Sequence, residues 1–235
     1  MKEFLKKIPS HIWTLILFIF ISVFFFAFDI ISKQIVLHNM NVGETINIIP
    51  SFFYFQYVIN DGMAFGLNFN ITSVNSDAWK IANKIIFISV SVIGTAIISF
   101  IFLRKYKTHK KLVTAALALM LAGCVGNLID RVFYTQEYLS KYATGVETYG
   151  VVDFIAFDFG SYSFPRFNIA DSCLVIGVII LIAYLIVEEI KEAKERRLRE
   201  ESELPEGKIL SKDEAEMMKE EPKKEVENKE ENNEL

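Results

Sequence analysis

The sequence has few of the side chains from which soluble hydrolases and metalloenzymes usually build their sites. It contains two cysteines, Cys124 and Cys173, and three histidines, His11, His38 and His109. Each cysteine lies alone in an apolar stretch, so neither a disulfide framework nor a cysteine-based metal site is indicated. The HExxH motif of zinc proteases is absent, and no histidine stands beside a suggestively placed nucleophile. We therefore expect a site without a metal or another cofactor.

The chain also lacks a basic face for nucleic acid. Its formal net charge is -4, but residues 191–235 contain 11 Lys and Arg against 16 Asp and Glu. The acidity therefore belongs to this C-terminal tail, and the chain before it is close to neutral. No RNA- or DNA-binding motif appears, so nucleic acid is not an expected partner.

Apolar residues, in contrast, are abundant: they make up 52% of the chain and give it a mean hydropathy of +0.31. A helix needs about 20 consecutive apolar residues to cross the hydrocarbon core of a bilayer. Four segments meet this requirement, 12–32, 81–103, 112–131 and 167–187. The first is too long for a cleaved signal peptide and ends without a small-residue cleavage site, so we interpret it as a retained helix.

Positively charged residues predict how these spans are oriented. They gather before the first span, in the connection 104–111 and after the fourth span. Because basic segments stay on the cytoplasmic side, these three regions should be cytoplasmic. The connections 33–80 and 132–166 carry few basic residues and should face outward. Both termini are then expected in the cytoplasm.

The predicted fold class is an all-α membrane protein, with four transmembrane helices and a small β-sheet outside the membrane. Segment 43–67 contains two runs rich in β-branched and aromatic residues, separated by Pro50 and Ser51. We expect these runs to form a sheet against the outer membrane face, with 132–166 as a second outer loop. The tail 191–235 should be largely disordered beyond a charged helical extension of the fourth span.

Polar side chains near the outer ends of the spans are the strongest functional signal. Ionisable groups are costly within a membrane, so they indicate function by default. Asn127 and Asp130 are three residues apart, as are Asn168 and Asp171, so each pair lies on one face of its helix. Because all four should lie at one membrane depth, we expect them to gather in one site.

Two carboxyl groups close together in a poorly solvated site cannot both ionise readily. One keeps a proton while the other acts as a base. Such a pair can activate water against a peptide carbonyl and later protonate the leaving amine. Asp171 has two equal candidate partners on these grounds, Asp130 and Asp153, which lies in the apolar stretch GVVDFIAF. Asp29 and Lys33, four residues apart, are either a structural ion pair or part of the site.

Two other functional classes also fit a four-span protein. A transporter or channel would line an ion path with buried Asp and Asn residues. Such a path favours polar residues at both membrane faces, whereas here they collect at one. A membrane scaffold that packs through small residues such as Ala122 and Gly123 gives no reason for acids at the helix ends. The pattern therefore favours an enzyme.

Five short motifs follow one another along these spans. They are Asp29 with Lys33, Asn60-Asp61-Gly62-Met63-Ala64-Phe65-Gly66, Gly126-Asn127-Leu128-Ile129-Asp130-Arg131, Val151-Val152-Asp153-Phe154 and Phe167-Asn168-Ile169-Ala170-Asp171-Ser172. In this order, and on these sides of four spans, they resemble the lipoprotein signal peptidase family, signal peptidase II, over about residues 12–190. The segment 132–150 is longer than the usual connection of that family, and the acidic tail is also unusual.

The resemblance implies an aspartyl endopeptidase of the bacterial inner membrane, acting as a monomer among membrane lipids with its site near the outer face. Its substrates would be prolipoproteins cut just before a cysteine that carries a diacylglyceryl group. The resemblance assigns catalysis to Asp153 and Asp171, and supporting structure to Asp130. The other supporting or substrate-binding residues that it implies are Asn60, Gly62, Asn127, Arg131, Asn168, Asp29 and Lys33.

Overall fold

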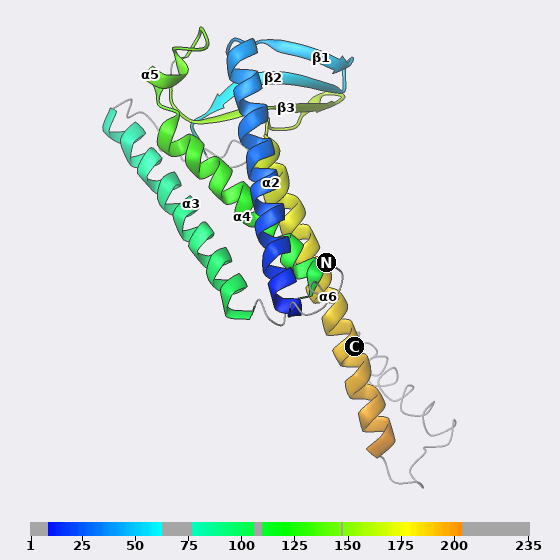
Figure 1. The fold of residues 1–235 in the computed structure, drawn as a ribbon. Helices are drawn as coiled ribbons and strands as arrows, with labels where there is room; N and C mark the ends of the chain where they lie inside the picture. The colour runs from blue at the N-terminus through cyan, green and yellow to red at the C-terminus, as the bar shows by residue number, and fades with distance from the viewer. Residues whose placement is uncertain (1–8, 63–76, 106–109, 147, 204–235) are drawn as a thin grey trace, which may run out of the picture. The chain divides into compact units, whose positions relative to one another are not determined.

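Four long helices and a small antiparallel sheet make up the part of the chain that the computed structural model describes, residues 9–62, 77–105, 110–146 and 148–203 (Figure 1). The helices are α2 (Ser10–Asn39), α3 (Asp77–Lys105), α4 (Lys111–Phe133) and α6 (Ile169–Glu203). Each is long and apolar enough to cross a membrane, which confirms the predicted fold class. The chain divides into two compact units, Met1–Leu185 and Ile186–Leu235, and the second contains the C-terminal part of α6.

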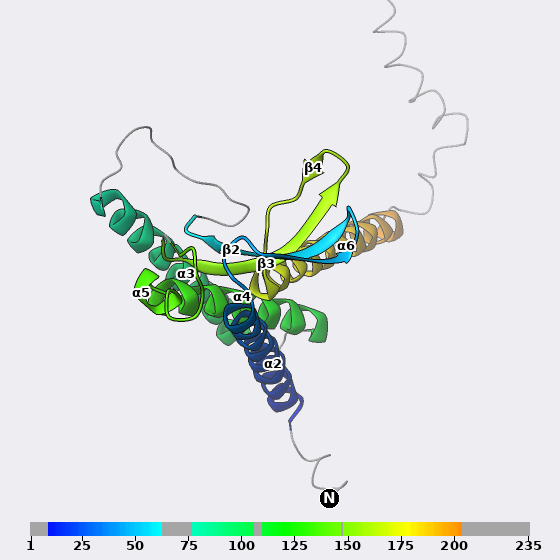
Figure 2. The same ribbon diagram turned by 90° about the horizontal axis from the view of Figure 1, so that it is seen from above.

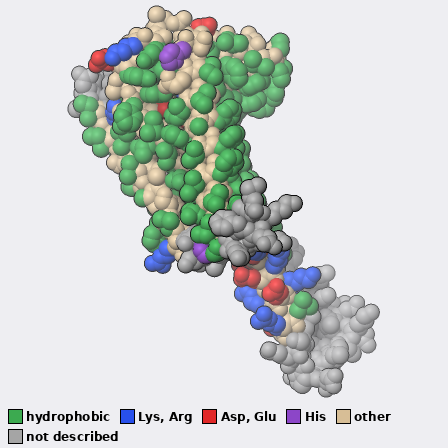
Figure 3. All heavy atoms as spheres, in the orientation of Figure 1, with side chains coloured by type: hydrophobic (Ala, Val, Ile, Leu, Met, Phe, Trp, Pro, Cys, Tyr) green, Lys and Arg blue, Asp and Glu red, His purple; other side chains and the backbone are tan. Residues whose placement is uncertain are grey.

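Helix α4 is the most enclosed of the four. Half of its most apolar 18-residue stretch is buried inside the protein, against 17% for the corresponding stretches of α2, α3 and α6. It contacts both α2 and α3. Figure 3 shows hydrophobic side chains covering the flank of the helices. Apolar side chains that no other helix covers are expected where a helix faces lipid instead of water.

Glycines allow α6 to approach α4 closely. A Cβ atom at Gly123 would overlap the carbonyl oxygen of Ala170, and one at Gly177 would lie 2.6 Å from Cγ of Met120. Small residues at such contacts let two helix backbones come close together in a membrane. The packing therefore holds the first turns of α6 against the middle of α4.

The sheet has four antiparallel strands in the order β1-β2-β3-β4 and draws on both connections that were predicted to face outward (Figure 2). The strands are β1 (Thr45–Ile49), β2 (Phe53–Asn60), β3 (Val151–Phe159) and β4 (Tyr162–Ser163). A turn at Pro50 and Ser51 separates the first two, with Ser51 in the left-handed region at φ 60°. The prediction confined β-structure to 43–67 and so missed β3 and β4.

A hydrophobic core joins the sheet to the nearby ends of α2 and α4. Its buried members are Val36, Leu37, Met40, Tyr57, Tyr134, Leu139, Ala143, Val152 and Phe154. The segment after α4 includes the short helix α5 (Gln136–Leu139), which was not predicted. Strands β2 and β3 pair with Val58 opposite Asp153 and Asn60 opposite Val151. The core therefore fixes Asp153 close to the ends of α2 and α4.

Some predicted features lie outside the described residues. Of the motif Asn60–Gly66, the structure describes only the first three residues. Of the predicted tail 191–235, it describes the part up to Glu203, which is helical and belongs to α6.

Candidate active site

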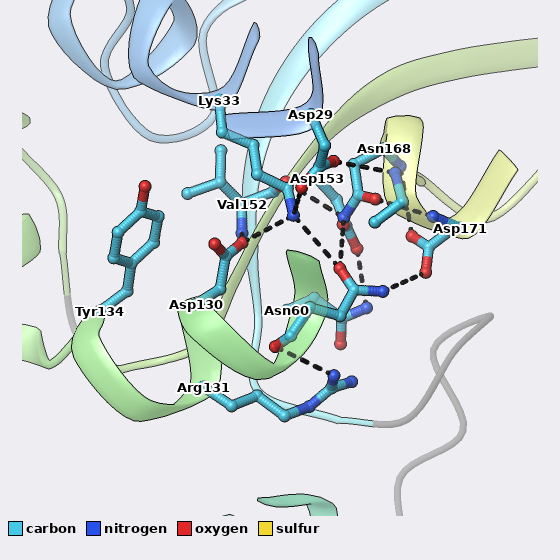
Figure 4. Close-up of polar contacts among 12 residues, drawn as sticks. Asp29, Lys33, Asn60, Asp130, Arg131, Tyr134, Val152, Asp153, Asn168 and Asp171 are labelled. Atoms are coloured by element: carbon cyan, nitrogen blue, oxygen red, sulfur yellow. Dashed lines mark hydrogen bonds and ion pairs between the residues drawn. The ribbon is translucent and has the colours of Figure 1, made fainter. Parts of the chain in front are cut away.

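Three fully buried charged side chains join α2 to α4. The ammonium group of Lys33 lies 2.7 Å from Asp29 Oδ2 and 2.9 Å from Asp130 Oδ2, and all three side chains are at most 1% exposed (Figure 4). A buried charge is tolerated only when it is paired and hydrogen-bonded, so the three residues depend on one another. Asp130 also accepts a hydrogen bond from the backbone N–H of Val152, 3.4 Å away, which links the cluster to β3.

Asp29 also holds the start of α6. Its Oδ1 accepts a hydrogen bond from the backbone N–H of Ala170 at 2.8 Å, which satisfies one of the free donors of the first helical turn. Gly126 makes room for this carboxylate, because a Cβ atom there would lie 2.6 Å from Asp29 Oδ2. The first and fifth motifs are thus joined at a contact with the third, where only glycine leaves enough room.

Asn168 and Asp171 cap α6 reciprocally. Asn168, the residue before the helix, accepts from the backbone N–H of Asp171 at 2.9 Å. In return, Asp171 Oδ2 accepts from the backbone N–H of Asn168 at 3.2 Å. This is the geometry of a capping box, with Asn in place of Ser or Thr and Asp in place of Glu. The three-residue spacing noted in the sequence therefore positions Asp171 at the helix N-terminus, where a negative charge is favoured.

Asp153 lies on β3, 1% exposed, and meets two side-chain amides. Its Oδ1 accepts from Asn168 Nδ2 at 2.7 Å, and its Oδ2 accepts from Asn60 Nδ2 at 2.7 Å. The orientation of the Asn60 amide is fixed in turn, because its Oδ1 accepts from the backbone N–H of Gly62 at 2.9 Å. Both oxygens of Asp153 are thus held by the ends of β2 and α6.

Asn127 connects the ion cluster on α2 and α4 with Asp171. Its Nδ2 donates to Asp171 Oδ1 at 2.8 Å, and its Oδ1 accepts from Lys33 Nζ and from Asn168 Nδ2, both at 3.2 Å. Arg131, one turn further on, donates to the carbonyl of Asn127 at 3.3 Å. It also donates to Ser91 Oγ of α3 at 3.4 Å. The polar side chains of α4 beside the two acids are therefore tied to α2, α3 and the start of α6.

Burial and proximity act together on the Asp153 carboxyl. Its removal from water, followed by the negative charge of nearby Asp171, raises the pKa of Asp153 from 3.8 to about 8. The hydrogen bonds from Asn60 and Asn168 oppose this shift but do not cancel it. Near neutral pH Asp153 therefore holds a proton. This is the behaviour expected of two carboxyl groups that share one site.

An apolar cavity of about 240 Å³ adjoins Asp171. It is lined by Phe164, Phe167, Asp171, Ser172, Val175 and Ile176. The exposed fraction of Ile176 is 49%, so the cavity opens toward the flank of α6, where lipid is expected. A polar acid pair next to an apolar cavity suits a substrate with both a peptide bond and an apolar portion.

The structure brings all ten residues suggested by the sequence into one connected cluster. It also distinguishes Asp130 from Asp153, which the sequence left as equal candidate partners of Asp171. Asp130 is neutralised by Lys33, whereas Asp153 and Asp171 meet only amide and backbone donors directly. Sequence reasoning missed that Asp153 lies on a strand. The β-branched and aromatic run VVDFIAFDF was the signal that could have revealed it. No group of three His, Cys, Asp or Glu side chains suited to a metal occurs among the described residues.

Comparison with known proteins places the chain in a family. A model of the family described as signal peptidase (SPase) II matches residues 21–187, more than two thirds of the chain. The chain belongs to the signal peptidase II family. Together with the four apolar helices, this makes it a multi-pass membrane protein of that family.

Individual relatives within the signal peptidase II family are moderately similar. A lipoprotein signal peptidase of Listeria monocytogenes serotype 4a is 33% identical over 165 residues, which cover 70% of this chain and 90% of the relative. One from Symbiobacterium thermophilum is 36% identical over 163 residues, covering 69% and 90%. Two solved bacterial membrane enzymes, both 32% identical, have TM-scores of 0.55 and 0.53. They cover 73% and 72% of this chain, and the chain covers 88% and 91% of theirs.

Proposed function

We propose that this protease of the signal peptidase II family removes signal peptides from bacterial prolipoproteins by aspartyl catalysis, with Asp153 and Asp171 as the catalytic pair. The observation that carries the proposal is the contrast among the buried acids. Asp29 and Asp130 are paired with Lys33, whereas Asp153 and Asp171 are held by amides and influence each other's charge.

The geometry supports a reaction in which water is the nucleophile. The ionised carboxylate of the pair takes a proton from a water molecule as the water oxygen attacks the scissile carbonyl carbon. The protonated carboxyl donates a hydrogen bond to the carbonyl oxygen, which becomes negative in the tetrahedral intermediate. When the C–N bond breaks, a proton passes from the pair to the leaving amine, and the pair returns to its single-proton state.

The supporting residues keep the two carboxyls from moving apart or collapsing together. Asn60 and Asn168 hold Asp153, and Asn127 holds Asp171. A pair positioned before substrate arrives lowers the reorganisation that the transition state requires. We propose that Arg131 acts at longer range, because its positive charge influences both acids without contacting either carboxylate.

The surroundings suit a substrate anchored in the membrane. The apolar cavity beside Asp171 would take an apolar part of a diacylglyceryl-modified prolipoprotein, cut just before its lipidated cysteine. By the positive-inside rule the sheet and the acid pair lie at the outer face of the bacterial inner membrane, with both termini in the cytoplasm. The polar cluster occupies one end of the helices, which fits a surface peptidase better than an ion path through the membrane.

The test is cleavage of a purified diacylglyceryl-modified prolipoprotein by the full chain in detergent, with a chelator and without nucleotide. Mass spectrometry should find one cut, directly before the modified cysteine. The unmodified prolipoprotein is the matched control and should be cleaved at least about tenfold more slowly, a difference of roughly 1.4 kcal/mol in the barrier. Absence of cleavage in detergent and in reconstituted vesicles would reject the proposal.

A further inference from the structure

The side-chain amide of Asn127 occupies a junction whose two ends are not interchangeable. Its carbonyl oxygen receives two donors, the Lys33 ammonium group and the Asn168 amide, both at 3.2 Å. Its NH₂ group donates to Asp171 at 2.8 Å. The side chain is only 4% exposed, so water cannot easily replace a lost partner.

The reversed amide would be unfavourable at both ends. Its NH₂ group would face the ammonium group of Lys33 and the NH₂ group of Asn168, neither of which can accept a hydrogen bond. Its carbonyl oxygen would face Asp171, an arrangement that is favourable only when that carboxyl carries a proton. The orientation of Asn127 and the protonation of Asp171 are therefore linked.

We propose that Lys33 is a positioning residue for catalysis: it fixes the carbonyl of Asn127, so that the NH₂ group of Asn127 faces Asp171 and designates Asp171 as the ionised base of the pair. This inference rests on the proposed function of the two acids. It assigns Lys33 a role beyond neutralising Asp29 and Asp130, and it gives Asp153 the role of the protonated partner.

The environments of the two acids support this division. Asp171 belongs to the first turn of α6 and accepts a backbone N–H in addition to the Asn127 amide. A helix N-terminus stabilises a negative charge, and charged acceptors make the stronger hydrogen bonds. Asp153 lies on a strand and meets two neutral side-chain amides, those of Asn60 and Asn168. Only Asp171 therefore has a helix terminus to stabilise its charge.

The charged groups around Asp171 come from three elements. Lys33 acts on it from α2, Arg131 from α4 and Asp153 from β3, and Lys33 is itself paired with Asp29 and Asp130. Removal of Lys33 would thus alter Asp171 in two ways, by loss of a nearby positive charge and by release of the Asn127 amide. A test has to separate these two effects.

A double-mutant cycle separates them because a charge effect does not need Asn127. The parent variant is Asp130→Asn, which keeps the Lys33–Asp29 ion pair. When Lys33 is removed from this parent, one buried acid, Asp29, is left without its partner, whereas in the wild type two acids would be. Lys33→Met is then introduced with Asn127 present and with Asn127→Ala. The readout is the pH at which kcat falls to half on the acidic side, where the base becomes protonated.

We expect Lys33→Met to move this acidic midpoint upward by about one pH unit when Asn127 is present. In the Asn127→Ala background the same substitution should move it by less than half as much. KM should change less than kcat, because the chain of contacts from Lys33 through Asn127 acts on the Asp171 carboxyl and not on the bound lipid. Equal shifts in the two backgrounds would overturn the proposal and leave Lys33 with a charge effect only.

A second measurement decides the matter if the variants do not fold. In the full wild-type chain, the side-chain NH₂ signal of Asn127 in a ¹⁵N-resolved spectrum should shift with the same midpoint as the acidic limb of kcat. A signal that stays constant over the pH range in which kcat falls would refute the link from Lys33 through Asn127 to Asp171. Failure of the proposed function looks different, because Asp171→Asn would then retain turnover whatever the midpoints show.

Discussion

Gly126 offers a sharp test of how tightly the acid cluster is packed. This residue of α4 lies against Asp29 and Ala170, and a Cβ atom there would be 2.6 Å from Asp29 Oδ2 and 3.2 Å from the Cβ of Ala170. Gly126→Ala must therefore displace the carboxylate that pairs with Lys33 and caps the start of α6.

The size of the effect follows from two opposing terms. In a helix, alanine is favoured over glycine by about 1 kcal/mol. Forcing a methyl group into a packed site costs about 1–3 kcal/mol, and here the displaced group is a buried charge. Gly94→Ala in α3 is the matched control, because its Cβ would meet only Cys124 Sγ at an ordinary 3.5 Å. Because the preference for alanine applies to both variants and cancels between them, they should differ by the overpacking cost, roughly 1–3 kcal/mol in unfolding free energy.

The assays are unfolding in detergent and turnover of a lipidated prolipoprotein. Gly126→Ala should be less stable than wild type, and Gly94→Ala equal to it or more stable. Turnover should fall about 10- to 100-fold for Gly126→Ala alone, because movement of the α6 start displaces Asn168 and Asp171 by a fraction of an ångström or more. If Gly126→Ala matched Gly94→Ala in both stability and turnover, the packing argument would be refuted.

Four further predictions follow from Asp153 and from other parts of the molecule. Turnover should fall as the pH rises through about 8, because Asp153 then loses its proton; a rate that keeps rising to pH 10 would contradict this. The same group binds a proton in the folded state that the unfolded chain has lost, so its contribution to stability should decline between about pH 4 and pH 8, measurable by unfolding at several pH values. Tyr57→Phe should change stability by less than about 1 kcal/mol, because the buried Tyr57 hydroxyl has no hydrogen-bond partner among the described residues; a larger loss would reveal one. Removal of residues 204–235 should change turnover in detergent less than tenfold, because every candidate site residue lies between Asp29 and Asp171 in the sequence. A larger loss would show that the tail takes part in the working enzyme.

Local patterns in the sequence were sufficient for the four helices and for the grouping of polar residues. Long apolar runs predicted the spans, and three-residue spacing predicted that Asn168 and Asp171 share a helix face. The family motifs also predicted the correct family. These features depend on residues that are near each other in the chain, which is why a sequence reveals them.

Long-range pairing was less predictable. Strand β3 pairs with β2 across more than 90 residues, and that pairing decides where Asp153 lies. The choice among the acids likewise depends on which one Lys33 neutralises, a contact between α2 and α4. On physical grounds the sequence left Asp130 and Asp153 equivalent as partners of Asp171. Their different environments appear only when α2, α4 and β3 are packed together, because Lys33 of α2 then pairs with Asp130 and not with Asp153.

The central claim, that Asp153 and Asp171 form the catalytic pair, is tested most directly by turnover of purified Asp→Asn variants on a diacylglyceryl-modified prolipoprotein. Asp153→Asn and Asp171→Asn should each lose nearly all cleavage while unfolding like the wild type. Asp130→Asn should instead lose stability, because it leaves Lys33 with one acid instead of two. Turnover near the wild-type rate for either Asp153→Asn or Asp171→Asn would contradict the account.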